Sequence, residues 1–546
     1  MATARIGAGR RGGRAARRRG EGPSEAGAGP VRPGVEGGRL ALLRDSDMRR
    51  IHETALWLLA EVGVADPLPS TVELVTARGG FVDGRGRLRL SRALVEDVIA
   101  RARREVLLAA RDPAWDLEPG GRRLYLATAG AAVEMVEEDG TLRPSTLSDL
   151  VRIAAAVDGL EHVHLFQRPV VCRDLDPERE LDLHTLYACL WGTRKHVGCG
   201  FTSARSLARA FALLHRLAGC EARWRARPFV SVPVCHVVPP LRCAPEACRV
   251  LETAVRGGMP VVLIAAGQAG ATSPAALAGA VAQQVAESLF GLVYVHSIDP
   301  AAPAVFAPWP LVSDLRSGAM SGGGPEQALL MAAAAQMGRY YDLPTGVAAG
   351  MTDSKCDDYQ AGMENALNHT LIAHSGANII YEAAGMRASL LAFSLPGLLL
   401  DAELLGMVLR TVKALDVDDA SLSAEVVAKV CLEGPGHFLD HPQTLELMHS
   451  GFLYPRFADR LAPDAWREAG RPTALERARR RLAALEAEPH AGYIPPDLHR
   501  ELVEAFFLRP PPGGWERPRP GEAVAAPRSE PPMAPDAAEQ EESGVR

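Results

Sequence analysis

Residues 229–265 read FVSVPVCHVVPPLRCAPEACRVLETAVRGGMPVVLIA, and they contain the unit that decides the fold. A short apolar run at 229–235 is followed by a helical run at 245–256 and by a second apolar run at 260–265. Short β-prone runs on either side of an amphipathic helix are typical of a β–α–β unit, whose two strands lie parallel. This stretch therefore predicts a parallel sheet with helices packed against it.

The same alternation recurs along the chain from about Leu124. We expect strands at residues 125–136, 163–169, 196–201, 229–235, 260–265, 304–307, 345–349 and 378–382. The helices between and after them are expected at 146–156, 180–191, 204–217, 245–256, 274–295, 325–341, 359–374 and 401–415. Eight strand–helix units in series predict an α/β fold of the (β/α)8 TIM-barrel type. An open doubly wound sheet is the alternative, although no Gly-x-Gly-x-x-Gly turn follows the first strand.

Segments outside these units complete the predicted organisation. Helical periodicity at 47–59 and at 91–104, with Ser91 as N-cap, predicts an N-terminal helical extension, and a C-terminal helical segment follows the barrel. Residues 1–38 are rich in Gly and Arg, and residues 509–546 in Pro, Glu and Ala, so both are expected to be disordered tails. The basic N-terminal tail has two interpretations. It binds RNA or phospholipid, or it is an unstructured extension without a partner. A single TIM-barrel domain is expected at 39–508.

Composition narrows the class of protein. The net charge of -6 gives no reason to expect nucleic acid as the main partner. No run of eighteen apolar residues is present, so no membrane span is predicted. The 9 cysteines are scattered, and a Gly/Pro/Glu stretch follows the N-terminal arginines, which together predict a cytoplasmic protein. Barrels with apolar outer helices often associate, so a homo-oligomer is expected.

Several blocks of sequence are shared with one enzyme family. Residues 270–280 read GATSPAALAGA, 314–318 read DLRSG and 351–364 read MTDSKCDDYQAGME. Residues 375–380, 404–407 and 436–439 add SGANII, LLGM and GHFL. From about Ile51 to about Ala505 these ordered blocks resemble the trimethylamine methyltransferase family. Two departures, Met363 where an aromatic residue is expected and Trp309 in a stretch that is usually Phe-Pro, concern the choice of amine.

The resemblance implies a methyltransferase that moves a methyl group from a methylated amine to the cobalt(I) of a corrinoid carried by a partner protein. Archaeal members carry pyrrolysine, expected in or near residues 350–355, and no such residue occurs here. A quaternary ammonium releases a neutral amine and needs no activation, whereas a neutral tertiary amine does. The chain is therefore expected to use a quaternary amine such as glycine betaine, with trimethylamine as the other candidate.

Barrel enzymes hold their active sites at the carboxyl ends of the strands and in the loops that follow, so the catalytic residues are expected there. Asp353 and Glu382 are placed to orient substrate or water, and Lys355 lies in the same loop as Asp353. Asp353 has a second interpretation as the cap of the next helix. His236 follows a strand and is expected to bond corrinoid or substrate, or else to brace its loop.

Candidate binding residues follow from the charge of the substrate. A quaternary ammonium favours aromatic faces, so Phe201, Trp309 and Tyr381 are candidates for an aromatic cage, with packing in the core as the alternative. A substrate carboxylate favours arginine, so Arg168 and Arg316 are candidates beside Gln167, although either arginine can serve a structural ion pair instead. The run Gly322, Gly323 and Gly324 before a helix is a candidate anion site for the corrinoid, or else a flexible loop.

Metal and rival functions complete the set of predictions. Cys235, His236, Cys243 and Cys248 lack the spacing of a zinc site, so no directly bound metal is expected. The alternatives to methyl transfer are a barrel that has drifted to another one-carbon or carboxylate substrate, and a diverged barrel that binds a small amine or betaine without methyl transfer.

Overall fold

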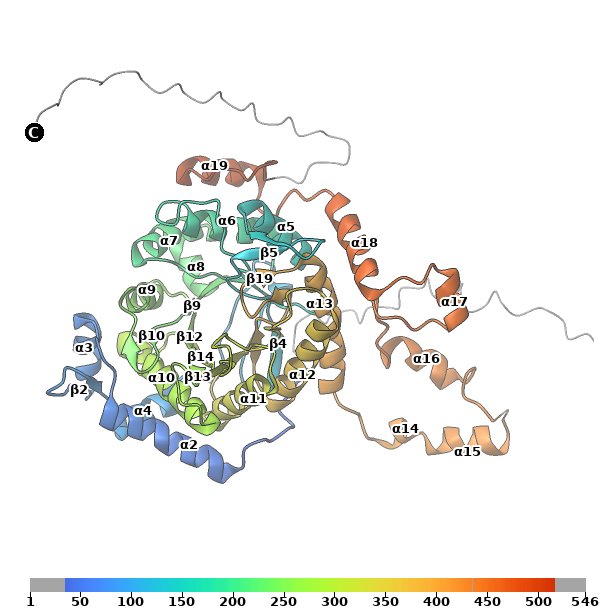
Figure 1. Ribbon diagram of the computed structural model, residues 1–546, viewed down its shortest axis with the longest axis horizontal. Coiled ribbons are helices and arrows are strands. Elements are labelled where there is room, and N and C mark those ends of the chain that lie inside the picture. The colour runs from blue at the N-terminus through green and yellow to red at the C-terminus, as the bar shows by residue number, and fades with distance from the viewer. Residues whose placement is uncertain (1–34, 435, 516–546) are drawn as a thin grey trace, which may run out of the picture.

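The computed structural model describes residues 35–434 and 436–515 and has a mixed α/β fold, with helices arranged around two parallel sheets (Figure 1). The first sheet is parallel throughout, in the order β14 (Ala304–Pro308), β12 (Val261–Ala265), β9 (Val230–Val234), β8 (His196–Gly198) and β7 (Leu165–Gln167). In the second sheet β16 (Gly346–Ala348), β17 (Ile379–Tyr381) and β4 (Arg123–Leu126) are parallel, and β1 (Val35–Glu36) adds an antiparallel edge. Parallel bridges Ala127↔Leu165 and Phe306↔Thr345 join the two sheets.

A helix follows each of the main strands and packs outside the sheets. These helices are α5 (Leu147–Asp158), α6 (Leu181–Gly192), α7 (Ala204–Ala218), α9 (Pro245–Arg256), α10 (Leu277–Ile298), α11 (Pro325–Tyr340), α12 (Tyr359–Ser375) and α13 (Leu395–Val412), with the short α8 (Glu221–Ala226) after α7. Each lies close to its predicted range. The exception is α13, which begins six residues before the predicted 401, because Ser394 caps it by accepting the Gly397 N–H at 3.0 Å.

The predicted strand at 125–136 is wrong, because the chain turns in its middle. Strand β4 ends at Leu126, Ala131 has a left-handed φ of 65°, and a separate strand β5 begins only at Glu134. The run is mostly apolar on both sides of the turn, so composition alone does not reveal it. Strand β5 belongs to a small third sheet in the order β18 (Met386–Arg387), β19 (Ala392–Phe393), β5 (Glu134–Val136) and β6 (Leu142–Pro144).

The predicted N-terminal helices are present as α2 (Asp45–Trp57), extended by a π-helical turn (Leu58–Val62), and α4 (Arg92–Arg101), which Ser91 caps. Other short elements are α3 (Pro69–Thr76), the 3-10 turn Pro113–Trp115, and the paired strands β2 (Phe81–Val82) with β3 (Leu88–Arg89), β10 (Val237–Val238) with β11 (Arg242–Cys243), and β13 (Gln268–Ala269) with β15 (Leu311–Val312). The C-terminal helical segment contains α14 (Asp419–Leu422), α15 (Ala424–Leu432), α16 (Pro442–Ser450), α17 (Pro463–Glu468), α18 (Ala474–Ala487) and α19 (Pro496–Phe506).

The predicted tails lie mostly outside the described residues, and the described parts of both are ordered. Val35 and Glu36 already pair with β4, so the ordered body begins before residue 39. Near the other end Trp515 is buried and packs edge-on against Tyr187, with ring centroids 5.0 Å apart. One hydrophobic core extends from Ile51 to Trp515. Among the described helices none is long and apolar enough to cross a membrane.

A buried ion triad joins the loops that follow the last two strands. The Arg387 guanidinium lies 2.7 Å from Asp357 and 3.0 Å from Asp401, and all three side chains are almost completely buried. Burial opposes the charge on Arg387, but the two carboxylates outweigh it and raise the pKa of the guanidinium. Asp401 also accepts the Gly385 N–H at 2.8 Å. The triad therefore ties α12, β18 and α13 to the strand end at Glu382.

Substitution of Arg387 by Met tests how much this triad contributes to the stability of the fold. Removal of the cation leaves two buried carboxylates without their partner, so we expect the free energy of unfolding to fall by about 3–5 kcal/mol. Urea unfolding followed by circular dichroism measures the change. Arg316→Met is the matched control, because its ion pair with Asp314 is 92% exposed on the arginine side, and the loss of an exposed pair changes stability little. Equal effects of the two substitutions would contradict the assignment.

Candidate active site

Glu382 directly follows β17, and its side chain is buried at this strand end. Its backbone has a left-handed φ of 60°, which is rare for a residue with a side chain. The carboxyl Oε2 accepts the Gly130 N–H at 2.6 Å. Burial raises the pKa of Glu382 to about 8, against an ordinary 4.5, so the carboxyl is mainly protonated at neutral pH.

Two glycines make room for Glu382 and Gln167. A Cβ atom at Gly130 would lie 2.9 Å from Glu382 Oε1 and 3.2 Å from Gln167 Cγ. A Cβ at Gly198, at the end of β8, would collide with Gln167 Oε1. Gln167 and Glu382 thus lie over the backbone of the neighbouring strand ends, and the structure brings these two predicted residues together.

Trp309 and Tyr381 form an aromatic pair from the ends of β14 and β17. Their ring centroids are 5.9 Å apart, and both side chains are buried. Trp309 Nε1 donates to the Gly346 carbonyl at 3.1 Å, and a Cβ at Gly346 would lie 2.6 Å from Tyr381 Cε2. The Tyr381 hydroxyl is buried and has no hydrogen-bond partner among the described residues. This pair therefore presents aromatic faces and one unsatisfied hydroxyl inside the sheets.

Arg168 lies at the rim of the same strand ends, on the side of α6. Its Nη1 donates to the Gly200 carbonyl at 3.3 Å and to Thr185 at 3.4 Å, while the buried Nε has no partner within the described chain. The hydrogen bonds of this guanidinium in the described chain go to a hydroxyl and a carbonyl, and none goes to a carboxylate. Arg168 is therefore available to an anion. Phe201 follows in the next loop and is half-buried against the core.

His236 is not at the site, so the catalytic one of its two predicted roles is not supported. Its Nε2 lies 2.9 Å from the Glu287 carbonyl in α10, and its ring stacks on Phe290 with centroids 6.0 Å apart. The side chain is fully buried between β9 and α10. The histidine shares the helix-facing side of Val232 and Val234, because alternate residues along a strand point the same way. It braces the wall of the fold.

Asp353 holds three loops together and does not cap α12. Its carboxylate accepts Ser321 Oγ at 2.8 Å, the Gly322 N–H at 2.8 Å and the Ser389 hydroxyl. The cap of α12 is Asp358, which accepts the Ala361 N–H at 2.9 Å. With three donors on its oxygens, Asp353 is occupied by the protein itself.

Lys355 and Arg316 lie on the surface, away from the buried strand ends. Lys355 Nζ donates to the Asp353 carbonyl at 2.7 Å, in an exposed contact. Arg316 pairs with Asp314 at 2.7 Å and is 92% exposed. A substrate at Glu382 would not contact them in this arrangement, because neither side chain is buried near it. Their predicted direct roles are not supported.

The glycine run is packed against acidic groups, which is unsuitable for an anion. The Gly322 N–H is bound to Asp353, and a Cβ at Gly323 would collide with the Glu364 carboxylate. Gly324 precedes α11 as its N-cap. Glu364 also accepts Thr352 Oγ1 at 2.6 Å and the Asp353 N–H at 2.8 Å. The predicted anion site at Gly322–Gly324 is therefore not supported, since two carboxylates already occupy the region.

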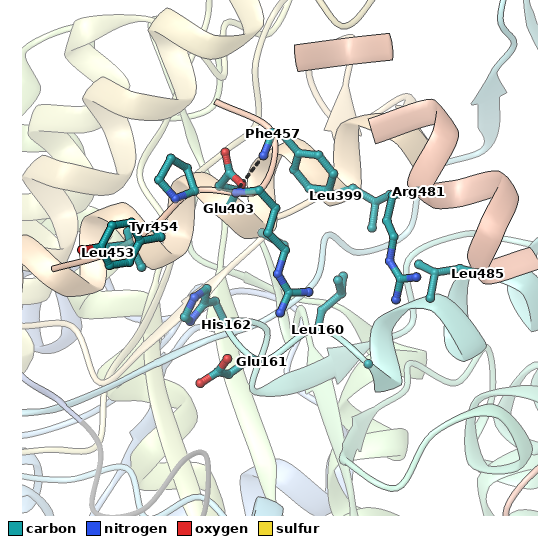
Figure 2. Close-up of a pocket in the computed structure, with 14 residues that line it drawn as sticks. Leu160, Glu161, His162, Leu399, Glu403, Leu453, Tyr454, Phe457, Arg481 and Leu485 are labelled. Carbon is teal, nitrogen blue, oxygen red and sulfur yellow. Dashed lines mark hydrogen bonds between the residues drawn. The ribbon is translucent and has the colours of Figure 1, made fainter. Parts of the chain in front are cut away.

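A cavity of about 170 Å³ lies elsewhere, at the opposite ends of the strands (Figure 2). Leu160, Glu161 and His162 line it just before β7 begins, and Leu399, Glu403 and Phe457 close it from α13 and the C-terminal segment. Figure 2 shows Glu403 accepting the Phe457 N–H, at 2.7 Å. Because it precedes β7, this cavity is separated from Gln167 by the length of that strand.

Gly130, Gly198 and the Arg387 triad are the parts of the site region that sequence reasoning missed. A glycine directly after or within a short predicted strand was the available signal for the first two, since such positions often allow a close approach. The signal for the triad was Asp401, which with Glu403 interrupts the otherwise apolar run 395–409. No group of three or more His, Cys, Asp or Glu side chains that could hold a metal ion occurs in the described part of the chain.

Comparison with known proteins gives a consistent result. A family model described as trimethylamine methyltransferase (MTTB) matches residues 10–510. The chain is 30% identical to a glycine betaine methyltransferase of Desulfitobacterium hafniense strain Y51, over 86% of this chain and 96% of the relative. It is 29% identical to the trimethylamine methyltransferase MttB of D. hafniense DCB-2, over 81% and 89%, and 28% identical to that of Methanosarcina barkeri strain Fusaro, over 80% and 88%.

Solved structures are more distant. The dihydropteroate synthase of Xanthomonas albilineans covers 57% of this chain and 100% of its own, with 13% identity and a TM-score of 0.33. A TM-score of this size is too low to assign a shared fold.

The raised pKa of Glu382 predicts a pH-dependent effect on stability. Between pH 4.5 and about 8 the unfolded chain releases this proton and the folded chain retains it, so Glu382 lowers stability as the pH rises through this window. We expect Glu382→Gln to raise the melting temperature at pH 8 and to leave it little changed at pH 5. Exposed Glu326, replaced by Gln, is the control and should show no such difference. An equal shift of Glu382→Gln at both pH values would rule out a retained proton.

Proposed function

Because the chain belongs to the trimethylamine methyltransferase family and is a methyltransferase, we propose that it moves a methyl group from a quaternary amine such as glycine betaine, or from trimethylamine, to the cobalt(I) corrinoid of a partner protein. The corrinoid is the methyl acceptor and belongs to the partner. Cobalt(I) supplies the electron pair for the new bond to carbon, and the electrons of the broken C–N bond stay on nitrogen. A quaternary ammonium thereby leaves as a neutral amine.

The proposal is carried by the buried carboxyl of Glu382. Alone, this group is held mainly neutral at pH 7, because burial raises its pKa to about 8. A permanent cation beside it would stabilise the carboxylate and lower that pKa, so the proton leaves when the substrate binds. The site then holds an ion pair out of water, where the attraction between charges is strongest.

The remaining groups at the strand ends suit the rest of a betaine. The faces of Trp309 and Tyr381 are expected to contact the N-methyl groups, at about 0.5–2 kcal/mol for each cation–π contact. Arg168, which has no carboxylate partner among the described residues, is expected to bind the substrate carboxylate through its fork of N–H donors. The side chain of Gln167 lies over Gly198 and is proposed to close one side of the site. Phe201 is proposed to close the site beside Arg168.

The preference for a quaternary substrate rests on the lack of a group at the site that could activate a neutral amine as the leaving group. The chain has no pyrrolysine, and Lys355 and His236, the two basic candidates, do not face Glu382. The residues that do lie at the strand ends bind a cation and exclude water. Glycine betaine is therefore the preferred substrate of the proposal.

We also infer that the two parallel sheets form one closed eight-stranded barrel, the (β/α)8 arrangement expected from the sequence. The bridges Ala127↔Leu165 and Phe306↔Thr345 support it, because they connect β4 to β7 and β14 to the start of β16. In such a barrel the corrinoid protein approaches the carboxyl ends of the strands, above Glu382. A single domain over residues 39–508 and a cytoplasmic, homo-oligomeric enzyme belong to the same proposal, and the nine unpaired cysteines support a reducing compartment.

Methyl transfer itself is tested by spectroscopy. Purified protein is mixed with cobalt(I) cobalamin or a cognate carrier and with glycine betaine, carnitine, proline betaine, choline or trimethylamine. We expect methyl-cobalt(III) to form with one or more quaternary amines, and Glu382→Gln to lower the rate at least tenfold while Glu326→Gln keeps it. Reaction with trimethylamine alone would retain the family chemistry and refute the quaternary substrate. No reaction with any amine, given a competent carrier, would favour a barrel that binds amines without transfer.

Substrate binding should depend on pH in a defined direction. Since a bound cation lowers the pKa of Glu382 from about 8, binding releases a proton and tightens as the pH rises. The limiting slope between pH 6 and 8 is about tenfold in Kd per pH unit. Isothermal titration with glycine betaine, in buffers of different ionisation enthalpy, counts the protons released. Glu382→Gln should remove the slope, and a slope that persists in this variant would assign the proton to another group.

A further inference from the structure

Residues 415–454, which we call the arm, leave the body after α13 and contain α14, α15 and α16. Figure 1 shows these three helices projecting beyond α13, to one side of the sheets. Within the three helices Val430 is the only buried residue among those described. No element of the described body packs closely against α14, α15 or α16. In a single copy the arm therefore has almost no core.

Short helices without packing are unstable in water, because a helix of fewer than about 12 residues does not offset the cost of its own nucleation. The helices of the arm have 4, 9 and 9 residues. Six large apolar side chains of the arm are 63–83% exposed, namely Leu415, Val417, Leu422, Leu432, Leu439 and Phe452. Exposed apolar surface of this extent is typical of a site that a partner covers.

The body of the same chain carries an apolar face of its own. On α12, Tyr359, Met363 and Leu367 are 83%, 52% and 47% exposed. Their spacing of four residues places them in one line along the helix. Leu329 on neighbouring α11 is 41% exposed. We call these four residues the stripe. Together the arm and the stripe expose about ten apolar side chains at roughly 100 Å² each, which exceeds the ~800 Å² per partner of a standard interface.

The arm could pack either on the stripe of a second copy or on the arm of that copy. The charges of these surfaces favour the stripe. Residues 415–454 contain seven carboxylates and one lysine, so two arms in contact would repel each other. Helix α12 has no lysine or arginine and a single carboxylate, Glu364, which is directed to Thr352 and the Asp353 N–H. The stripe is thus apolar and nearly neutral, and it accepts an acidic arm without repulsion.

We propose that the arm of one copy packs on the stripe of a second copy, and that the exchange is reciprocal, giving a twofold dimer. A symmetric dimer of this kind needs both surfaces on each chain, as found here. Within one copy the arm does not cover the stripe, since the arm projects away from α12. The proposal does not depend on methyl transfer and stands or falls by itself. It places the partner's arm beside the loop at 350–358, next to the carboxyl ends of the strands.

Two native cysteines allow a direct test on the full-length chain. Cys431 precedes Leu432 on the arm, Cys356 lies three residues before Tyr359 at the start of the stripe, and both are exposed thiols. Unlabelled and ¹⁵N-labelled protein are mixed, allowed to exchange and treated with a short bismaleimide. We expect Cys431–Cys356 cross-links that join labelled to unlabelled peptides, and their loss in Cys431→Ser and in Cys356→Ser. Cross-links only within one copy, or Cys431–Cys431 links, would overturn the proposal.

The solution mass gives an independent readout. Light scattering after gel filtration should report twice the 58.3 kDa of one chain. Leu432→Asp on the arm and Met363→Asp on the stripe should each halve that mass. Phe507→Asp is the control, because Phe507 is 84% exposed outside both surfaces and should leave the dimer intact. A monomeric wild-type chain, or a dimer that survives both substitutions, would contradict the exchange.

Discussion

The buried pairing of Arg387 with Asp357 and Asp401 fixes the segments on which the candidate site depends. Three chain segments, the loop before α12, strand β18 and helix α13, meet at this one guanidinium. Asp401 extends the contact to the Gly385 N–H, three residues after Glu382. A charge held this deeply is retained only while its partners stay in place, so the triad couples the positions of the segments. The unusual backbone of Glu382 is thus held from both sides, by β17 before it and by Gly385 after it.

Glycines also help to hold Glu382 in place. Its side chain and carbonyl lie so close to neighbouring backbone that a side chain at these glycine positions would collide with them. Gly130 offers its N–H to Glu382 and leaves room for Gln167, and a Cβ at Gly350 would lie 2.7 Å from the Glu382 carbonyl. Asp353 holds the neighbouring loops together, because its carboxylate accepts hydrogen bonds from Ser321, Gly322 and Ser389. The polar side chain of Asp353, in the loop at 351–358, is therefore occupied in holding neighbouring loops together, and the proposed chemistry is assigned to Glu382 and the residues around it.

The strands and helices could be predicted because their signals are local. Seven of the eight expected strands are found at their places, and the eighth failed because the run at 125–136 stays mostly apolar through a turn at Ala131. Side-chain direction was harder to predict. His236 and Gln167 both follow strands, yet the first faces α10 and the second faces Gly198, which only the alternation along each strand decides. Pairings across the chain, such as Arg387 with Asp401, have no local signal, and neither do the carboxylate neighbours of the glycine run, which come from a later part of the chain.

The protonation of Glu382 connects burial to selectivity. An ionised carboxylate in this position would bear the full cost of desolvation in the free enzyme, whereas the neutral acid avoids most of it. The same low polarity makes the carboxylate a strong partner once a cation displaces the proton. A neutral ligand of the same shape that has no basic nitrogen gains no such pairing, and it leaves the carboxyl protonated. Because the cost of ionisation is met only when a positive charge is present, the proposed role of Glu382 predicts that the site favours a cationic ligand over a neutral one.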